Sequence, residues 1–140
     1  EGLNFVTANS PVPVLADESV FTPRDALRIM QERAADMVNI KLMKCGGLTN
    51  ALRIVSAAEV YSVECMMGCM LEAKVSVTAA AHLACARSAI TRIDLDGPAL
   101  CSEDPVEGGA IFEGSTISLT EAPGLGITGI TGIDGFKYII

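Results

Sequence analysis

The stretch DMVNIKLMKCGGLTNALRIVSAAEVY, residues 36–61, decides the fold class of this 140-residue chain. Its first part, DMVNIKL at 36–42, is a short apolar run with β-branched residues, which is typical of a buried strand. After a turn that contains two glycines, LTNALRIVSAAEVY at 48–61 carries apolar residues at the three- and four-residue spacing of an amphipathic helix. Strands that alternate with helices in this way predict an α/β fold with a parallel sheet.

The same order recurs on both sides of this unit. Further strands are expected at VPVLADES (12–19), SVECMMGC (62–69) and TRIDLDG (91–97). Helices are expected at TPRDALRIMQER (22–33), where a threonine can cap the helix and proline takes the first helical position, and over the alanine-rich residues 71–89. After the fourth strand the pattern weakens.

One polar or thiol-bearing residue marks the end of each expected strand. These residues are Asp17, Lys41, Cys69 and Asp94, and they follow one another at separations of 24, 28 and 25 residues. A strand, a crossover helix and two loops need about 30 residues. The carboxyl ends of parallel strands gather at one edge, where a β/α barrel or a doubly wound sheet assembles its site.

Composition narrows the classes of partner. The chain has 17 acidic and 10 basic residues, a net charge of −7, and no basic run, so we expect no nucleic acid partner. Charged residues interrupt the longest alanine-rich stretch, so we expect no membrane span. Five cysteines without a C-x-x-C pair indicate reduced thiols in a cytoplasmic protein, and the single histidine, His82, argues against a zinc site.

The fourth strand carries two like charges. Asp94 and Asp96 share one face, because strand side chains alternate, and Ile93 and Leu95 share the other. Two close carboxylates are costly to bury unless a cation lies near them. The alternative is a solvated edge strand or a turn, since Asp-Gly-Pro follows at 96–98.

The earlier strand ends offer a lysine and a carboxylate. Lys41 shares a strand face with Asn39, and a lysine directed into a desolvated barrel mouth would have a lowered pKa and could act as a base. The alternative is a lysine whose stem packs while its ammonium reaches solvent. Lys44, in the following loop, is expected to be exposed. Asp17 and Glu18 are expected on opposite faces of a strand, so that only one of them faces the interior.

The glycine-rich tail contains GLGITG at 124–129, which matches the pattern G-x-G-x-x-G. We do not interpret it as a dinucleotide-binding loop, because no strand leads into it and no helix is expected after it. A loop-rich segment is expected instead.

Taken in order, ADES, NIKLMKCGG, ECMMGCMLE and TRIDLDGP resemble the C-terminal half of the muconate-lactonizing subgroup of the enolase superfamily. The resemblance is strongest to the dipeptide epimerases, typified by L-Ala-D/L-Glu epimerase. It implies the C-terminal half of a (β/α)-barrel over residues 1–127, with residues 128–140 as a tail that packs back toward a capping domain. It also implies Mg²⁺-dependent epimerisation of dipeptides such as L-Ala-L-Glu, by proton abstraction next to a carboxylate through an enediolate.

Carried over by position, Asp17 resembles the third metal-binding carboxylate of the family, and Lys41 resembles its acid/base lysine on the sixth strand. The resemblance implies that four further residues bind the substrate: Cys69, Leu71, Asp94 and Asp96. The last two match the pair that receives the α-ammonium of the dipeptide, which is the cation that their charges require.

The family's opposing lysine, its two other metal carboxylates and its capping domain do not lie in this chain. The chain begins with Glu1, not Met, just past where the fourth barrel strand would end. We therefore expect half a barrel, inactive alone, that is completed by an N-terminal half or by further copies in a homo-oligomer. A cycloisomerase, an N-acylamino acid racemase, an o-succinylbenzoate synthase and an inert fragment that only associates remain alternatives.

Overall fold

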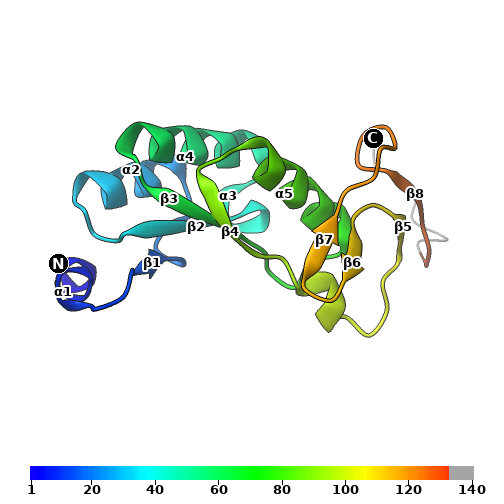
Figure 1. Cartoon of the computed structure of the whole chain (residues 1–140), viewed down its shortest axis with the longest axis horizontal. Coiled ribbons are helices and arrows are strands. Elements are labelled where there is room, and N and C mark those ends of the chain that lie inside the picture. The colour runs from blue at the N-terminus through cyan, green and yellow to red at the C-terminus, as the bar shows by residue number, and fades with distance from the viewer. Residues whose placement is uncertain (133–140) are drawn as a thin grey trace.

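A parallel sheet of four strands forms the centre of the computed structural model, which describes residues 1–132. Its strands lie in the order β1 (Leu15–Ala16), β2 (Met37–Lys41), β3 (Glu64–Gly68) and β4 (Ile90–Asp94). The helices that connect them, listed in chain order, are α2 (Pro23–Gln31), α4 (Leu48–Tyr61) and α5 (Lys74–Ala86). Figure 1 shows all three helices along one side of the sheet. The predicted α/β fold with parallel pairing is confirmed.

Local sequence explains where these elements begin and end. Helix α2 starts with a capping box, in which the Thr22 hydroxyl accepts a hydrogen bond from the Asp25 backbone at 3.2 Å and the Asp25 carboxylate accepts one from the Thr22 backbone at 2.8 Å. The short helix α3 (Leu42–Cys45) follows β2 directly, and Gly46, at φ 83°, ends it in the left-handed conformation that glycine adopts at little cost. This turn leads the chain into α4.

The hydrophobic core lies between the sheet and the helices. Val38 and Ile40 point from β2 toward the helices, and both side chains are buried. They pack in one core cluster with Ile54 of α4 and Val77 of α5. Alternate residues of β2 face the other way, so Asn39 and Lys41 share the opposite face of the sheet.

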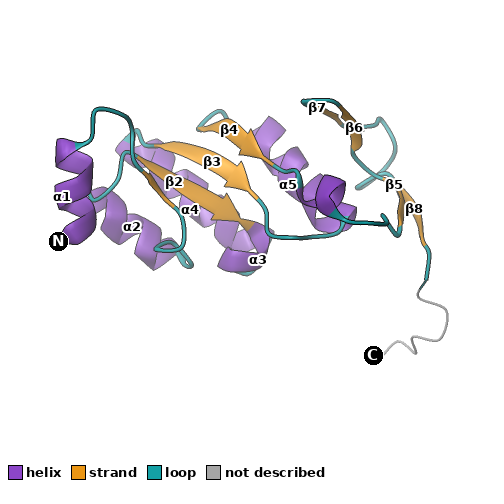
Figure 2. Cartoon of the chain, turned by 90° about the horizontal axis from the view of Figure 1, so that it is seen from below, coloured by secondary structure: helices purple, strands orange, loops and turns teal. Residues whose placement is uncertain are grey.

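The second face of the sheet is the one that a closed barrel would turn inward, and in the described part of the chain no helix covers it (Figure 2). At β4 only Ile90 is buried, because β4 is an edge strand here. Of the two interpretations of this segment, the solvated edge strand is the one observed. Arg92 forms an ion pair with Glu64 of β3 across this face at 2.6 Å.

The segment after β4 holds small elements that the sequence pattern did not resolve. They are the 3₁₀-helix η1 (Gly97–Leu100) and the strands β5 (Val106–Gly108), β6 (Ile111–Glu113), β7 (Thr116–Ser118) and β8 (Ile127–Ile130). Strands β6 and β7 form a hairpin, and β5 pairs antiparallel with β8. The glycine pattern at 124–129 thus leads into strand β8 and not into a helix. A dinucleotide-binding loop would be followed by a helix, so this agrees with our interpretation of the pattern.

The remaining helix, α1 (Gly2–Asn9), lies at the N-terminal end of the sheet, near β1 (Figure 1). Of the expected tail at 128–140, residues 133–140 lie outside the described residues. The division at residue 127 stays a prediction. None of the helices described within residues 1–132 has both the length and the apolar character needed to span a bilayer.

Candidate active site

The polar residues predicted at strand ends meet at one rim of the sheet. Lys41, Gly68 and Asp94 are the last residues of β2, β3 and β4, and the strand register pairs Lys41 with Gly68 and Gly68 with Asp94. Neighbouring strands lie about 4.8 Å apart, so the Cα atoms of Lys41 and Asp94 are separated by roughly 10 Å. Gly68, between them, has no side chain, so no side chain of β3 at this position separates the lysine from the carboxylate.

Lys41 is held by two carboxylates that follow β1. Its ammonium lies 2.8 Å from Oδ2 of Asp17 and 3.2 Å from Oε1 of Glu18. The expectation that Asp17 and Glu18 point to opposite faces is therefore wrong. Strand β1 ends at Ala16, and both carboxylates lie in the turn beyond it, where the alternation of a strand no longer applies.

Lys44 also reaches Asp17, although it was expected to be exposed. Its side chain is only 4% exposed and forms an ion pair with Oδ1 of Asp17. It donates to the Asp17 backbone carbonyl at 2.5 Å, and its ammonium lies 5.8 Å from the centre of the Phe21 ring. Lys44 lies in α3, which starts directly after Lys41, so the chain turns it back toward the rim. The prediction for Lys44 is wrong for this reason.

The charges at this cluster set the protonation of its members. Burial acts to raise the pKa of Asp17, but hydrogen bonds from Lys41 and Lys44 outweigh it, so the pKa is lowered. The hydrogen bond to Asp17 is the largest influence on Lys41 and raises its pKa, against a smaller opposing effect of burial. The predicted lowering of the Lys41 pKa is therefore wrong in this structure. Ion pairing prevails over desolvation, and Lys41 is an ammonium.

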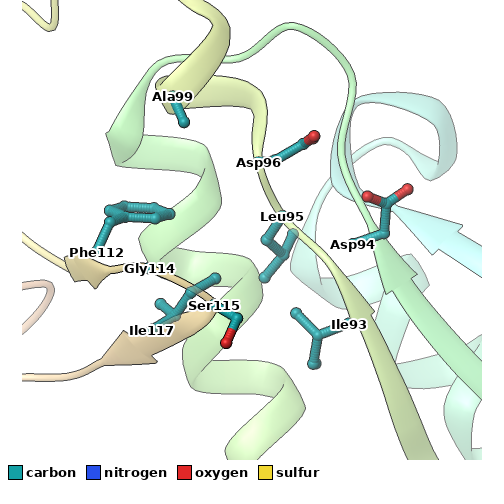
Figure 3. Close-up of a pocket in the computed structure, with 9 residues that line it drawn as sticks. All are labelled: Ile93, Asp94, Leu95, Asp96, Ala99, Phe112, Gly114, Ser115 and Ile117. Carbon is teal, nitrogen blue, oxygen red and sulfur yellow. The ribbon is translucent and has the colours of Figure 1, made fainter.

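Asp94 and Asp96 lie at the far end of the rim from Asp17. Figure 3 shows both carboxylates directed away from Phe112 and the β6–β7 hairpin, while Ile93 and Leu95 lie on the side of the hairpin. The predicted alternation of the four side chains thus holds here. Both aspartates are exposed, which leaves them accessible to a cation.

A cavity of about 350 Å³ lies between the β4 end and the hairpin, lined by residues that include Ile93, Leu95, Phe112 and Ile117. Its walls are mostly apolar. Asp94 and Asp96 also line it, although their carboxylates are directed away from Phe112 (Figure 3). The cavity therefore borders the rim that carries the charges.

Cys69 and Leu71 follow β3. Leu71 is 73% exposed, and burial raises the pKa of the half-buried Cys69 thiol. The loop that holds them is fixed by Glu72, a buried carboxylate that accepts hydrogen bonds from the Met70 backbone at 2.8 Å and from Ser76. Glu72 was not among the residues predicted from the sequence, because a glutamate four residues past the end of β3 carries no pattern that separates it from a surface residue.

Magnesium takes carboxylate, water and substrate oxygens, and commonly only one or two carboxylates come from the protein. Among residues 1–132, no group of three or more histidine, cysteine, aspartate or glutamate side chains is arranged to hold a metal. Asp17, 28% exposed at the open rim with a lowered pKa, fits as one ligand of a metal site. Further ligands would have to come from outside the described residues.

Comparison with known proteins identifies the family to which this fold belongs. A family model described as enolase C-terminal domain-like matches residues 1–130. The chain belongs to this family. Its α/β fold is that of the C-terminal half of an enolase-superfamily barrel, as the sequence resemblance predicted.

Several of the similar proteins are named as dipeptide epimerases, and others as an N-succinyl-L-Arg/Lys racemase and a muconate cycloisomerase. The chain is 64% identical over 130 residues to an L-Ala-D/L-Glu epimerase from Clostridium acetobutylicum, which covers 93% of this chain and 36% of that protein. A substrate-liganded L-Ala-D/L-Glu epimerase from Bacillus subtilis superposes with a TM-score of 0.90 at 50% identity, covering 92% of this chain and 36% of that one. A dipeptide epimerase from Cytophaga hutchinsonii, in complex with Mg and D-Ala-L-Val, has a TM-score of 0.89 at 35% identity over 94% of this chain and 36% of that chain. The chain thus spans little more than a third of these relatives.

Proposed function

We propose that this chain forms the C-terminal half of a Mg²⁺-dependent dipeptide epimerase. The observation that carries the proposal is the row Lys41, Gly68 and Asp94, in which no side chain of the intervening strand separates a lysine from a carboxylate. Epimerisation of a dipeptide needs one group that transfers the α-proton and a second group that binds the α-ammonium. The second group must keep the substrate at a fixed distance from the first. The most similar of the relatives reported above are named as dipeptide epimerases, which supports the same substrate class.

Lys41 is the residue to which we assign proton transfer. As an ammonium, held by Asp17 and Glu18, it can return a proton to a planar carbon. To remove a proton it must first be neutral. A metal ion held by Asp17 would bring positive charge close to Lys41 and so would lower the pKa that Asp17 otherwise raises. The same residue can then act in both directions of the reaction, on one face of the substrate.

Asp17 is the residue of this chain that would hold Mg²⁺, together with ligands from the rest of the protein. When bound, the metal supplies positive charge that stabilises the anion formed next to the substrate carboxylate. The chain's own contribution is to keep Asp17 ionised and fixed in place by two lysines.

Asp94 and Asp96 are assigned to the α-ammonium of the dipeptide, and Cys69 and Leu71 to the wall of its pocket. Two exposed carboxylates on the same side of one segment attract a cation better than either does alone. A substrate without an ammonium, such as an N-acylamino acid, gains nothing from them. This distinguishes an epimerase from the racemase and cycloisomerase alternatives.

Exchange of the α-proton with solvent deuterium tests the proposal in the complete protein. We expect the NMR signal of an α-proton of L-Ala-L-Glu to disappear in D₂O with Mg²⁺ present. Asp94→Asn and Asp96→Asn should each raise KM about tenfold, a loss of roughly 1.4 kcal/mol of binding. Glu113→Gln, an exposed change of the same charge, should leave KM unaltered.

Two results would contradict the proposal. No exchange on any L,L-dipeptide would overturn it. Exchange on N-acylamino acids alone, unaffected by Asp94→Asn, would assign the rim to a racemase.

A further inference from the structure

A buried amide lies beneath this rim. Asn39 is in the middle of β2, on the same face as Lys41 and one step further from the rim, and it is 2% exposed. Within residues 1–132, its Oδ1 is buried and has no hydrogen-bond partner. Buried polar groups nearly always find partners, so an unpaired acceptor here calls for an explanation.

The position of Asp17 explains the orientation of the amide. Asp17 follows Ala16, which pairs with Val38, so Asp17 lies beside Asn39 on the neighbouring strand. Asn39 also acts to lower the pKa of Asp17, with a smaller effect than Lys41 and Lys44. An ionised carboxylate only accepts hydrogen bonds, so the amide must present its NH₂ group to Asp17. Its oxygen is then directed away and left unpaired.

Gly68 makes room for this amide. A Cβ atom at position 68 would lie 2.6 Å from Oδ1 of Asn39 and 3.0 Å from its Nδ2. The backbone of Gly68 does not need glycine, because Gly68 is not among the glycines with positive φ. Glycine inside a strand weakens it, so the space for Asn39 is the reason we find for its presence.

We propose that Asn39 is a positioning residue for the Asp17 carboxylate and that Gly68 provides the space it needs. The inference rests on the proposed function, in which Asp17 contributes to a Mg²⁺ site. Asn39, from β2, and Lys44, from α3, then hold Asp17 even when Lys41 turns to the substrate. A carboxylate fixed in this way loses little freedom when it binds a cation, which favours binding.

Magnesium affinity of the complete protein, measured by titration calorimetry without substrate, tests this role apart from activity. We expect Asn39→Ala to raise the Mg²⁺ Kd at least tenfold, because Asp17 is no longer oriented. Gly68→Ala should also raise it, because the added methyl group displaces the amide. The double variant should be no worse than Asn39→Ala, since alanine at position 39 leaves room for a Cβ at position 68.

A matched control separates positioning from packing. Met66 pairs with Asn39 in the strand register and lies on the same face. Met66→Ala should lower the melting temperature and leave the Mg²⁺ Kd within twofold of wild type. If Asn39→Ala does not fold, Gly68→Ala alone decides, because it keeps Asn39 and moves only its amide.

Three results would overturn the inference: an unchanged Kd in a folded Asn39→Ala or Gly68→Ala protein, additive effects in the double variant, or an equal loss in Met66→Ala. A wild-type protein that binds no Mg²⁺ would instead overturn the proposed function itself. The two failures are therefore distinguishable.

Discussion

At the scale of single residues, Asp17 is the centre of the charge network. It is paired with Lys41 and Lys44, and the Lys44 side chain is almost completely buried. A buried ammonium that loses its carboxylate partner is left with an uncompensated charge, which costs more than the pair contributed. Asp17 is thus important for stability as well as for the proposed chemistry.

We predict that Asp17→Asn destabilises the metal-free complete protein by about 3 kcal/mol near pH 7. The pKa of Asp17 is lowered in the folded state from its usual value of 3.8, so its stabilising contribution is present above that value. The contribution is lost as the pH falls through the folded-state pKa. The difference in unfolding free energy between wild type and variant, from urea titrations between pH 7 and pH 3, should therefore shrink toward the acid end. A difference that stays constant over this range would contradict the assignment.

The sequence predicted some of these residues and not others. Asp17, Lys41 and Asp94 could be placed at one rim, because parallel strands at regular spacing bring their ends together. The partners of Lys41 could not be predicted, because β1 ends one residue before Asp17 and a turn has no fixed alternation. The orientation of Lys44 depends on the short helix α3, which four residues between a strand and a glycine pair do not reveal.

At the scale of elements, the N-terminus of α2 shows how local sequence fixes the position of the rim. The capping box of Thr22 and Asp25 follows the turn that carries Asp17 and Glu18. It satisfies backbone N–H groups that would otherwise be unpaired at the start of the helix.

Thr22→Ala should therefore lower the free energy of unfolding by about 1 kcal/mol, through loss of the cap. Chemical denaturation of the complete protein measures this directly. Thr49→Ala is a suitable control, because Thr49 lies exposed in the first turn of α4, where Gly47 is the cap and no side-chain cap bond is present. An equal effect of both changes would show that the threonine of α2 contributes as an ordinary surface residue.

The long elements were predictable and the short ones were not. The expected helices at 22–33, 48–61 and 71–89 contain the observed α2, α4 and α5, because each spans enough turns to show an apolar period. The strands of the C-terminal segment have three or four residues, too few for alternation to be distinguished from chance. Their pairing depends on glycines such as Gly114, at φ 60°, in the turn of the β6–β7 hairpin.

At the scale of the whole molecule, the sheet has an uncovered face and two edge strands, β1 and β4, within the described residues. Apolar side chains are exposed at both ends, with Phe5 at 70% and Ile93 at 51%. Parallel sheets normally have both faces covered, and exposed strand edges promote association. We therefore expect a partner to cover the inner face, either the remainder of a barrel or another copy of the chain.

We predict that the chain expressed alone, over residues 1–140, associates and binds the dye ANS, because one face of the sheet is uncovered, two strand edges are unpaired within the described residues, and large apolar side chains such as Phe5 and Ile93 are exposed. Light scattering after size-exclusion chromatography should give a mass above the 14.6 kDa of one chain. Addition of a separately produced N-terminal half should restore a defined species and remove the ANS signal. A monodisperse 14.6 kDa monomer without ANS binding would contradict the prediction.

The row of Lys41, Gly68 and Asp94 has a consequence for how such a site can change. Its three positions are joined by the backbone hydrogen bonds of adjacent strands, so the interval between the proposed proton carrier and the proposed ammonium anchor is fixed by the sheet. Loops around the rim can vary to accept new side chains, but they do not alter this interval. On this assignment we expect α-dipeptides with varied side chains to be accepted and backbones lengthened by one methylene to be rejected.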